Sequence, residues 1–434
     1  MHRISIAALL ALAAASVVPN AAAAAKYSAP HLFCAKKNCT DGAGPWAPPV
    51  ADGAGNYYGA TSAGGAGSEG VIYRMSLAGK HWTYSVLYSF CAQKKCADGS
   101  EAHGGLIRDT AGNLYGTTVE GGATGQGAIY ELSPNGSGWK YKVLHDFCSA
   151  KDCADGSLPQ EVTLAYQGQA SGVAYDGSSA LYGTAGSGGN GSGVAFSLTP
   201  NTGKTKWTEK VIHAFCAKSQ CTDGGAPFTG VMVDGSGNLF GTSISGAKYA
   251  KGAVYELQRN GANWTYTSLH DFCADQNTCA DGAIPVGIPV MDGAGNLFGT
   301  TAAGGTGGAT PGQGGTAYKL TRSGAKWKLS TLHNFCLETD CDDGQAPYSS
   351  LVIDAGGHLF GTTYLGGDAN AGTMFRLSGG KLTTFDRLLS FGGTDTPGTI
   401  PIGGMMLDSS GAFFGTGATG GNANGGGAFY EYTP

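Results

Sequence analysis

Cysteine, histidine and aspartate recur at a fixed spacing along this 434-residue chain. Six copies of one phrase carry His or Tyr, a Phe two residues later, two nearby cysteines and an Asp-Gly pair, as in His145 to Gly156. These residue types support three kinds of chemistry. Thiolates bind soft metals or form disulfides, carboxylates bind calcium, and a histidine beside a carboxylate transfers protons.

The N-terminal segment indicates the redox compartment of the cysteines. Residues 1–25 combine a basic Arg3, an apolar stretch from Ile6 to Val18 and a final run of small residues. This pattern predicts a secretory signal peptide, too short for a membrane helix and removed from the mature protein. We therefore expect a periplasmic or extracellular protein. We expect no membrane or wall anchor, because no second apolar segment appears before Pro434.

The cysteines fall into six local pairs of nearly identical spacing, which favours local disulfides over cross-pairing in an oxidising compartment. The pairs are Cys34/Cys39, Cys91/Cys96, Cys148/Cys153, Cys216/Cys221, Cys273/Cys279 and Cys336/Cys341. A tetrahedral zinc site needs four ligands, whereas one pair supplies two. The seventh copy, from Phe391 to Asp395, has no cysteine, so we expect the bridge to brace a loop that the fold builds without it.

Two series of aspartates follow the repeat. The first series is Asp41, Asp98, Asp155, Asp223, Asp281 and Asp343, each followed by Gly, with Asp395 in the seventh copy. A circle of carboxylates that binds calcium is one interpretation; a turn in which Asp bonds its own backbone also explains the Gly, and we expect the turn. The second series is Asp52, Asp109, Asp176, Asp234, Asp292, Asp354 and Asp408. It lacks the later ligands of a calcium loop and predicts capped hairpins.

Histidines occur once in most copies, at His31, His145, His213, His270 and His333. Equivalent positions in separate repeats lie too far apart to share one metal ion, so we expect packing or hydrogen bonds between repeats. The chain has no nucleophile elbow, phosphate-binding loop, His-Glu-x-x-His motif or dinucleotide fingerprint. We therefore expect no metal and no cofactor.

The fixed spacing comes from a sequence repeated seven times. A Phe closes each copy, at Phe33, Phe90, Phe147, Phe215, Phe272, Phe335 and Phe391. The second copy holds four short strand-like runs, 104–109, 113–118, 128–132 and 139–147, separated by Gly, Asn, Asp and Pro. Four antiparallel strands per repeat predict an all-β fold, a seven-bladed β-propeller with four-stranded blades.

The two ends of the chain complete one blade. Residues 26–33 match only a fourth strand, and residues 404–432 match only the first three strands. We expect the N-terminal strand to join the three C-terminal strands and close the ring, so that residues 26–434 form a single domain. In such a ring every Cys-x4-Cys loop and every glycine-rich loop lies on one face, which we call the top face.

Residues that differ between copies are better candidates for recognition than repeated ones. Just before the first strand, several copies read Ala-Pro-X or a near variant, where X is Trp46, His103, Gln160, Phe228, Val286, Tyr348 or Ile402. We expect X near the central channel on the top face, where aromatic rings stack on sugars or other flat ligands. The alternative is that X only packs each loop differently. Insertions at 155–176 and 304–315 are further candidates, since insertions on one face of a repeat protein often shape a binding site.

The repeat resembles a known bacterial family. The segments "IRDTAGNLYGTTVEGG", "GAIYELSPNG" and "WKYKVLHDF", with Asp-Gly shortly after the Phe, are similar to the GloVer (Gloeo-Verruco) tandem-repeat proteins. The resemblance covers essentially the whole mature chain and implies a secreted or surface-displayed propeller-like protein. It implies no activity and no catalytic residues. The cysteine pairs and the missing C-terminal sorting anchor depart from the family's pattern.

The net charge of the chain limits the classes of binding partner that we expect. With 26 Lys and Arg against 31 Asp and Glu, the net charge of −5 disfavours nucleic acid and anionic membranes. We expect a secreted, monomeric, non-enzymatic module that binds a glycan or another extracellular ligand, such as a protein, through Trp46, His103, Phe228 and Tyr348. Two alternatives stay open: a polysaccharide lyase or hydrolase using His103 with Glu101 or Glu120, and a structural envelope protein.

Overall fold

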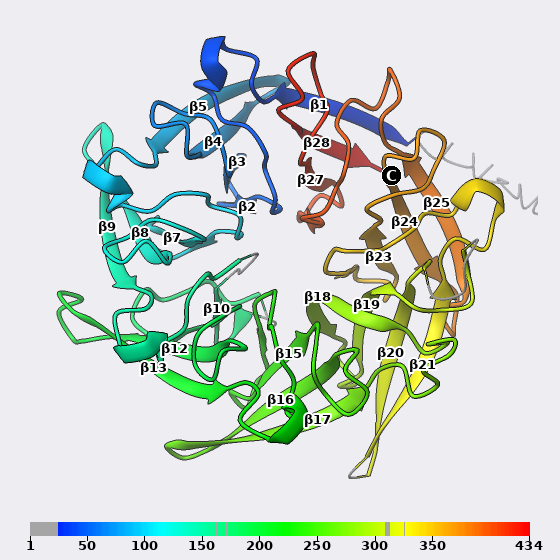
Figure 1. Cartoon of the computed structure of the whole chain (residues 1–434). Coiled ribbons are helices and arrows are strands. Elements are labelled where there is room, and N and C mark those ends of the chain that lie inside the picture. Colours follow the sequence, from blue (N-terminus) through cyan, green and yellow to red (C-terminus); the bar gives the residue numbers. More distant parts are fainter. Residues whose placement is uncertain (1–24, 161–163, 170–171, 309–312, 325) are drawn as a thin grey trace, which may run out of the picture.

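Seven antiparallel sheets of four strands form a ring around a central axis (Figure 1). The computed structural model describes residues 25–160, 164–169, 172–308, 313–324 and 326–434. The predicted signal peptide therefore lies, except for Ala25, outside the described residues. Helical structure in the described ranges is confined to short turns such as Lys37–Cys39, and no helix there is long and apolar enough to cross a membrane. The predicted seven-bladed propeller is confirmed.

Each blade runs from a short inner strand to a long outer strand. Blades 1 to 4 are β2–β5 (Val50–Ala51, Asn56–Ala60, Val71–Ala78, His81–Ser89), β6–β9 (Ile107–Arg108, Leu114–Thr118, Ala128–Asn135, Gly138–Asp146), β10–β13 (Ala165–Tyr166, Leu181–Ala185, Val194–Pro200, Trp207–Ala214) and β14–β17 (Met232–Val233, Leu239–Ser243, Ala253–Asn260, Asn263–Asp271). Blades 5 to 7 are β18–β21 (Ala283–Met291, Leu297–Ala303, Thr316–Ser323, Lys326–Asn334), β22–β25 (Val352–Ile353, Leu359–Thr362, Thr373–Ser378, Thr384–Ser390) and β26–β28 with β1 (Met405–Leu407, Phe413–Gly417, Ala428–Thr433, Lys26–Leu32).

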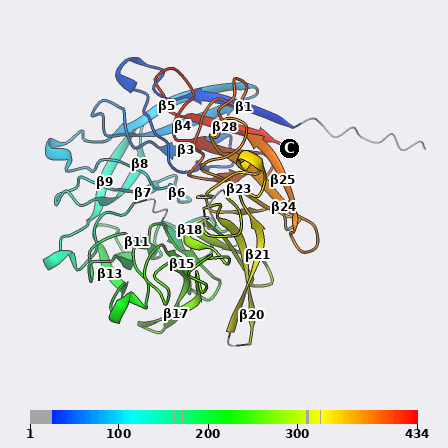
Figure 2. The same ribbon diagram turned by 45° about the vertical axis from the view of Figure 1, so that its right-hand side comes forward.

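Blade 7 is built from both ends of the chain, as the sequence predicts. β1 pairs antiparallel with β28, with Lys26 opposite Thr433 and Leu32 opposite Ala428, and the two strands lie side by side in Figures 1 and 2. The Tyr27 hydroxyl also donates a hydrogen bond of 2.6 Å to the carbonyl of Pro397. These contacts close the ring without leaving β28 as a bare edge.

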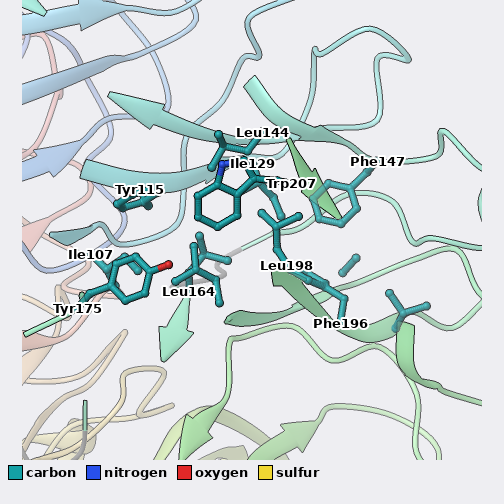
Figure 3. Packing of buried hydrophobic residues seen from close by; sticks show 13 residues of the cluster. Ile107, Tyr115, Ile129, Leu144, Phe147, Leu164, Tyr175, Phe196, Leu198 and Trp207 are labelled. Atoms are coloured by element: carbon teal, nitrogen blue, oxygen red, sulfur yellow. The ribbon is translucent and has the colours of Figure 1, made fainter. Parts of the chain in front are cut away.

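The core lies between the blades rather than within one of them. Every closing Phe has no exposed surface, and each packs against an aromatic ring on the third strand of the next blade, as Phe33 does against Tyr73 at 5.1 Å. Figure 3 shows one such cluster, with Phe147, Phe196 and Trp207 between blades 2 and 3. Single blades therefore have no buried core of their own.

The glycine that follows the Tyr or Phe of each second strand has a packing reason. At Gly59, a Cβ atom would lie 2.3 Å from the Tyr73 hydroxyl oxygen, because the third-strand ring lies across the second strand. Gly415 and Tyr430 repeat this contact at the same distance. The repeated glycine thus makes room for the ring that the closing Phe contacts.

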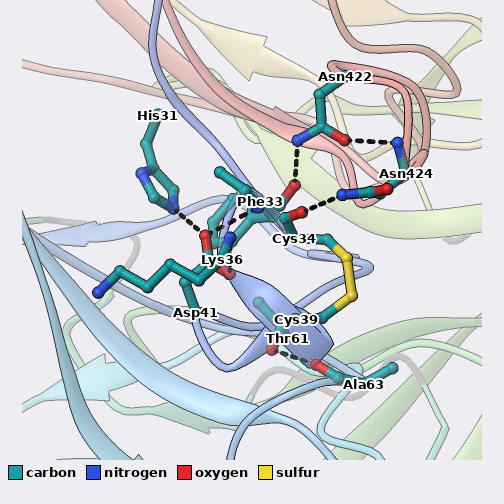
Figure 4. The surroundings of a disulfide bond; sticks show 11 residues. His31, Phe33, Cys34, Lys36, Cys39, Asp41, Thr61, Ala63, Asn422 and Asn424 are labelled. Carbon is teal, nitrogen blue, oxygen red and sulfur yellow. Dashed lines mark hydrogen bonds and ion pairs between the residues drawn. A yellow bond between two sulfur atoms is a disulfide. The ribbon is translucent and has the colours of Figure 1, made fainter.

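All six predicted local disulfides are formed on the top face. They join Cys34 to Cys39, Cys91 to Cys96, Cys148 to Cys153, Cys216 to Cys221, Cys273 to Cys279 and Cys336 to Cys341. In the first loop the Asp41 carboxylate accepts backbone N–H bonds of 3.1 Å from Ala35 and Lys36 (Figure 4). The carboxylates of the Asp-Gly series are thus used by the turn. Within the described ranges no group of three or more His, Cys, Asp or Glu side chains is placed to hold a metal ion.

The fifth loop is one residue longer than the other five. Cys273 and Cys279 are six positions apart, whereas the other five pairs are five apart. The Cys279 N–H bonds the carbonyl of Asp275, four residues back, at 2.7 Å, whereas Cys39 bonds Lys36, three residues back. The extra residue therefore replaces the short helical turn with a wider turn, and the Asp281 carboxylate caps the N–H of Cys273 itself at 3.0 Å. The pairing is as predicted, but the turn differs.

The fourth-strand histidines lie beside the same aspartates. His270 and His333 are hydrogen-bonded to them at 3.0 Å, whereas Nε2 of His31, His145 and His213 lies farther from the carboxylate and has no hydrogen-bond partner among the described residues. His31 Nε2 lies 3.6 Å from Asp41 Oδ2, and His333 Nε2 lies 3.0 Å from Asp343 Oδ2. In the second copy Tyr88 takes this place and donates a 2.6 Å bond to Asp98. The rings of His31, His213 and His333 also stack on an aromatic ring in the next blade's outer strand, with centroids 3.8 Å apart for His31 and Tyr84. The prediction of packing or hydrogen bonds is therefore confirmed as packing for His31 and His213 and as a hydrogen bond for His270 and His333.

The third copy differs from the rest. Its inner strand β10 ends at Tyr166, well before Asp176, and Tyr175 is fully buried, where its carbonyl accepts a bond from Thr110 of blade 2. The insertion therefore places Tyr175 in the interface between blades 2 and 3. Parts of it, residues 161–163 and 170–171, lie outside the described residues, as do residues 309–312 of the predicted long loop in blade 5.

Removing residues 26–33 from a chain that otherwise begins at residue 26 should open the ring. The deletion exposes the β28 edge and empties the site of Phe33, whose loss alone costs about 3–5 kcal/mol. We expect a lower melting temperature in calorimetry and concentration-dependent association in light scattering. A chain lacking only residues 1–25 is the control, and equal melting and association of the two chains would show that β1 is dispensable.

Replacing His31 by Tyr, the residue that the second copy uses, should flatten the acid sensitivity of folding. Burial lowers the pKa of His31 to about 4, partly offset by the Asp41 charge. The pKa of the histidine in the unfolded chain is about 6.5. The contribution of the neutral His31 ring to the free energy of unfolding is therefore complete above that pH and is lost as the pH falls toward 4. Between pH 7 and 4.5 the wild type should lose about 2 kcal/mol more than His31→Tyr in urea unfolding. Parallel pH dependence of the two proteins would contradict this origin.

Candidate functional site

A central channel of about 810 Å³ runs between the inner strands. Its wall is largely apolar, formed by first-strand residues such as Met291, Val352 and Met406. Four of the seven methionines of the chain line it, namely Met232, Met291, Met405 and Met406. Its volume lies in the range of about 300–1,000 Å³ typical of small-molecule sites, and methionine side chains adapt to varied ligand shapes.

The residues at position X occupy one side of the channel mouth. Tyr348, Ile402, Trp46 and His103 line the channel and come from blades 6, 7, 1 and 2, which are consecutive in the ring. We call these four residues the crescent. Gln160, Phe228 and Val286, from blades 3 to 5, do not line the channel; Phe228 is half-buried and Val286 is fully buried. Three of the four candidate ligand-binding residues thus meet at one cavity.

Trp46 and His103 form a stacked pair at the mouth. Their ring centroids are 4.9 Å apart and their planes are nearly parallel, at 3°. Both side chains are half-buried, so the pair keeps an accessible surface. Tyr348, two blades away, lies 6.1 Å from Tyr364 of a neighbouring loop. Flat, partly exposed rings of this kind stack on the apolar faces of sugars and of other ring-bearing ligands.

A repeated backbone bond holds position X in every blade. The residue two places before X donates its N–H to a glycine-rich loop carbonyl of the preceding blade, as Gly44 does to Gly426 at 2.9 Å and Glu101 to Glu69 at 3.0 Å. Glu101 adopts a positive φ of 57° to do so. The frame is therefore fixed by the backbone, and the side chain at X is free to vary.

The proline of Ala-Pro-X has a matching partner. A Cβ atom on Gly427 would lie 2.7 Å from Pro45, and the same contact joins Gly193 to Pro227. At six of the seven junctions the last glycine of the glycine-rich loop thus accommodates the next blade's proline ring; in the second copy Ala102 stands in place of the proline. The sequence repeat shows the proline before position X but not the glycine that it contacts. The regular recurrence of a glycine before the third strand is the sequence signal of this contact.

The electrostatics of the mouth are uneven. Burial lowers the pKa of His103 to about 4, so its ring is neutral at neutral pH, and its Nε2 lies 3.8 Å from Glu101 Oε2. Burial raises the pKa of Glu101, as do the nearby charges of Glu120 and Glu69. The stacked pair is therefore an uncharged surface beside three carboxyl groups, which disfavours an anionic ligand at this point.

Comparisons with known proteins agree with this architecture. The model of the Gloeobacter/Verrucomicrobia repeat matches residues 21–180 and 274–434. A search of curated proteins finds no match. Among solved structures, the extracellular domain of a putative hybrid two-component system from B. thetaiotaomicron is similar at 11% identity and a TM-score of 0.50, over 89% of this chain. This chain spans 39% of that one.

The β-propeller domain of the Trilobed protease from Pyrococcus furiosus is also similar, at 7% identity and a TM-score of 0.44, over 90% of this chain and 93% of that one. At such identities the likeness concerns the fold alone. The family match, in contrast, covers most of the sequence and coincides with the repeat that builds the blades. The chain therefore belongs to the Gloeobacter/Verrucomicrobia repeat family.

Proposed function

We propose that this protein is a secreted binding module that holds a neutral glycan, or a similar ring-bearing ligand, on the crescent at the channel mouth. The observation that carries the proposal is the parallel Trp46–His103 pair at the opening of a channel of about 810 Å³. One ring of the ligand would stack on this pair, and Tyr348 would contact a neighbouring unit. The six disulfides support an oxidising compartment.

A binding role fits the way the fold uses its polar groups. The repeated aspartates and histidines are used by turns and by packing between blades, as His31 and Asp41 are. The crescent residues occupy a position whose loop is held by the repeated backbone bond. Their side chains can therefore differ from blade to blade, which makes them candidates for recognition.

An enzymatic role is the second candidate, and the carboxyl cluster favours it. Glu101 has a raised pKa and lies beside the neutral His103, which together supply an acid and a base. Incubation with polysaccharides should then release reducing ends or unsaturated products, and His103→Ala should abolish the release. Absence of any product from a panel of neutral and acidic polysaccharides would remove this candidate.

Alanine substitution in the crescent should weaken glycan binding. A glycan array selects the best ligand, and calorimetry then measures its affinity for each variant. We expect Trp46→Ala and Tyr348→Ala each to lower affinity by about tenfold or more, because each removes a stacking surface.

Phe228→Ala is the matched control, since Phe228 occupies the same position in the repeat but does not line the channel. Its affinity should stay within about twofold of wild type. Equal loss in all three variants would move the site from the channel mouth to the wider top face. Identical array profiles for wild type and Trp46→Ala would contradict the proposal.

A further inference from the structure

The loops on the outer rim of the top face share one plan but carry different charges on opposite halves of the ring. The loops at 34–40, 91–97, 148–154 and 216–222 follow one another around the ring and carry Lys36, Lys37, Lys94, Lys95, Lys151 and Lys218. We call these six lysines the basic arc. Asp152 is the single acidic residue of these four loops. The next two loops carry no lysine and are acidic, with Asp275 in one and Glu338, Asp340 and Asp342 in the other.

The geometry of the basic arc is visible in Figure 1. The short helical turns at Lys37–Cys39, Lys94–Cys96, Lys151–Cys153 and Ser219–Cys221 lie at the periphery from blue through green, and the acidic turn Thr339–Cys341 lies apart, in yellow. The charges thus separate by position in the ring. A uniform scatter of surface charge would not confine every lysine of these loops to four consecutive blades.

The lysines are presented on rigid supports. Each loop is closed by a disulfide, and an aspartate carboxylate caps it, as Asp98 does for the N–H groups of Ala92 and Gln93 at 3.0 and 3.1 Å. All six lysine side chains are exposed. Among the described residues none of their ammonium groups pairs with a carboxylate, whereas Asp342 of the acidic half is paired with Arg387. The positive charges are therefore not neutralised by ion pairs, and their loops are fixed in position.

We propose that the basic arc binds a carboxylate-bearing polysaccharide along the outer rim of the top face. Lysine ammonium groups act as compact point charges that attract carboxylates without demanding a bidentate geometry. The four loops contain no arginine and no aromatic residue. They therefore lack the guanidinium groups that bind phosphates in a bidentate geometry and the aromatic rings that stack on bases. This chemistry favours an acidic glycan over nucleic acid.

The carboxyl groups nearer the channel define the path of such a chain. Glu69, Glu101 and Glu120 form a group near the channel mouth. The Glu101 N–H bonds the carbonyl of Glu69, the charges of Glu69 and Glu120 act on Glu101, and Glu101 is two residues from His103, which lines the channel. They repel an anionic polymer from the mouth and keep it on the rim. The basic arc is thus a second surface, independent of the ligand proposed for the crescent.

Charge reversal tests the basic arc directly. The probe is polygalacturonate, with neutral dextran as the comparison, and binding is measured by biolayer interferometry at several salt concentrations. Wild type should bind polygalacturonate but not dextran, and affinity should fall steeply with salt. The variant Lys36→Glu/Lys37→Glu/Lys94→Glu/Lys95→Glu should lose affinity by about 30-fold or more.

The matched control reverses four exposed lysines on the opposite face, Lys80→Glu/Lys140→Glu/Lys206→Glu/Lys326→Glu, with the same change in net charge. It should stay within about threefold of wild type. Equal losses of affinity in both variants would show that binding responds only to the net charge of the protein. An unchanged affinity in the first variant would show that polygalacturonate binds outside the basic arc. Either result overturns the proposal. Duplex DNA bound as tightly as polygalacturonate would overturn the class of partner. Melting curves of both variants check that folding is intact.

Discussion

The structure depends on one packing contact repeated around a closed ring. The closing Phe of each blade has no exposed surface and packs against the third-strand aromatic ring of the next blade, as Phe391 does against Tyr430 with ring centroids 5.3 Å apart. A blade therefore becomes stable only when it has a neighbour on each side. The pairing of β1 with β28 supplies the last neighbour, and it places the two ends of the chain in one sheet.

Ring closure also produces the channel and assigns the inner strands to its wall. Because each inner strand is short and borders the axis, its apolar side chains, such as Met406 and Val352, face a shared space instead of a second layer. The loop before that strand is fixed by a backbone bond to the preceding blade and, in all blades but the second, by a proline–glycine contact as well. The scaffold is thus complete without the side chain at position X, and selection on binding can change that side chain at little structural cost.

Much of the scaffold follows from the sequence because every blade needs the same residues. The repeat, the incomplete copies at 26–33 and 404–432, and the paired cysteines predict seven blades, ring closure and the local disulfides. The Asp-Gly turns and the packing of the fourth-strand histidines are predictable for the same reason. Asp41 accepts a backbone bond within its turn, and His31 lies beside it. Agreement between local signals and the global fold is what makes these predictions reliable. Where one copy has an extra residue, as before Cys279, the pairing persists but the turn changes.

Other features depend on contacts between copies, which no single copy encodes. Trp46 follows Gly-Pro and Phe228 follows Ala-Pro, so the two residues have nearly the same sequence context. That context does not indicate that Trp46 stacks on His103 at the channel mouth while Phe228 lies away from the channel. The burial of Tyr175 against Thr110 depends on an insertion without a counterpart. The lysine-bearing loops follow one another in the sequence, but their alignment along one arc of the top face depends on how neighbouring blades pack into the ring.

The central claim is that repeated residues form the scaffold and the unrepeated crescent forms the site. A crystal structure of residues 26–434 soaked with neutral oligosaccharides tests this claim most directly. The account predicts a sugar ring parallel to the Trp46–His103 pair, with the repeated Asp and His side chains unchanged in position. A ligand bound to the repeated aspartates, or on the opposite face with the crescent uncontacted, would contradict it.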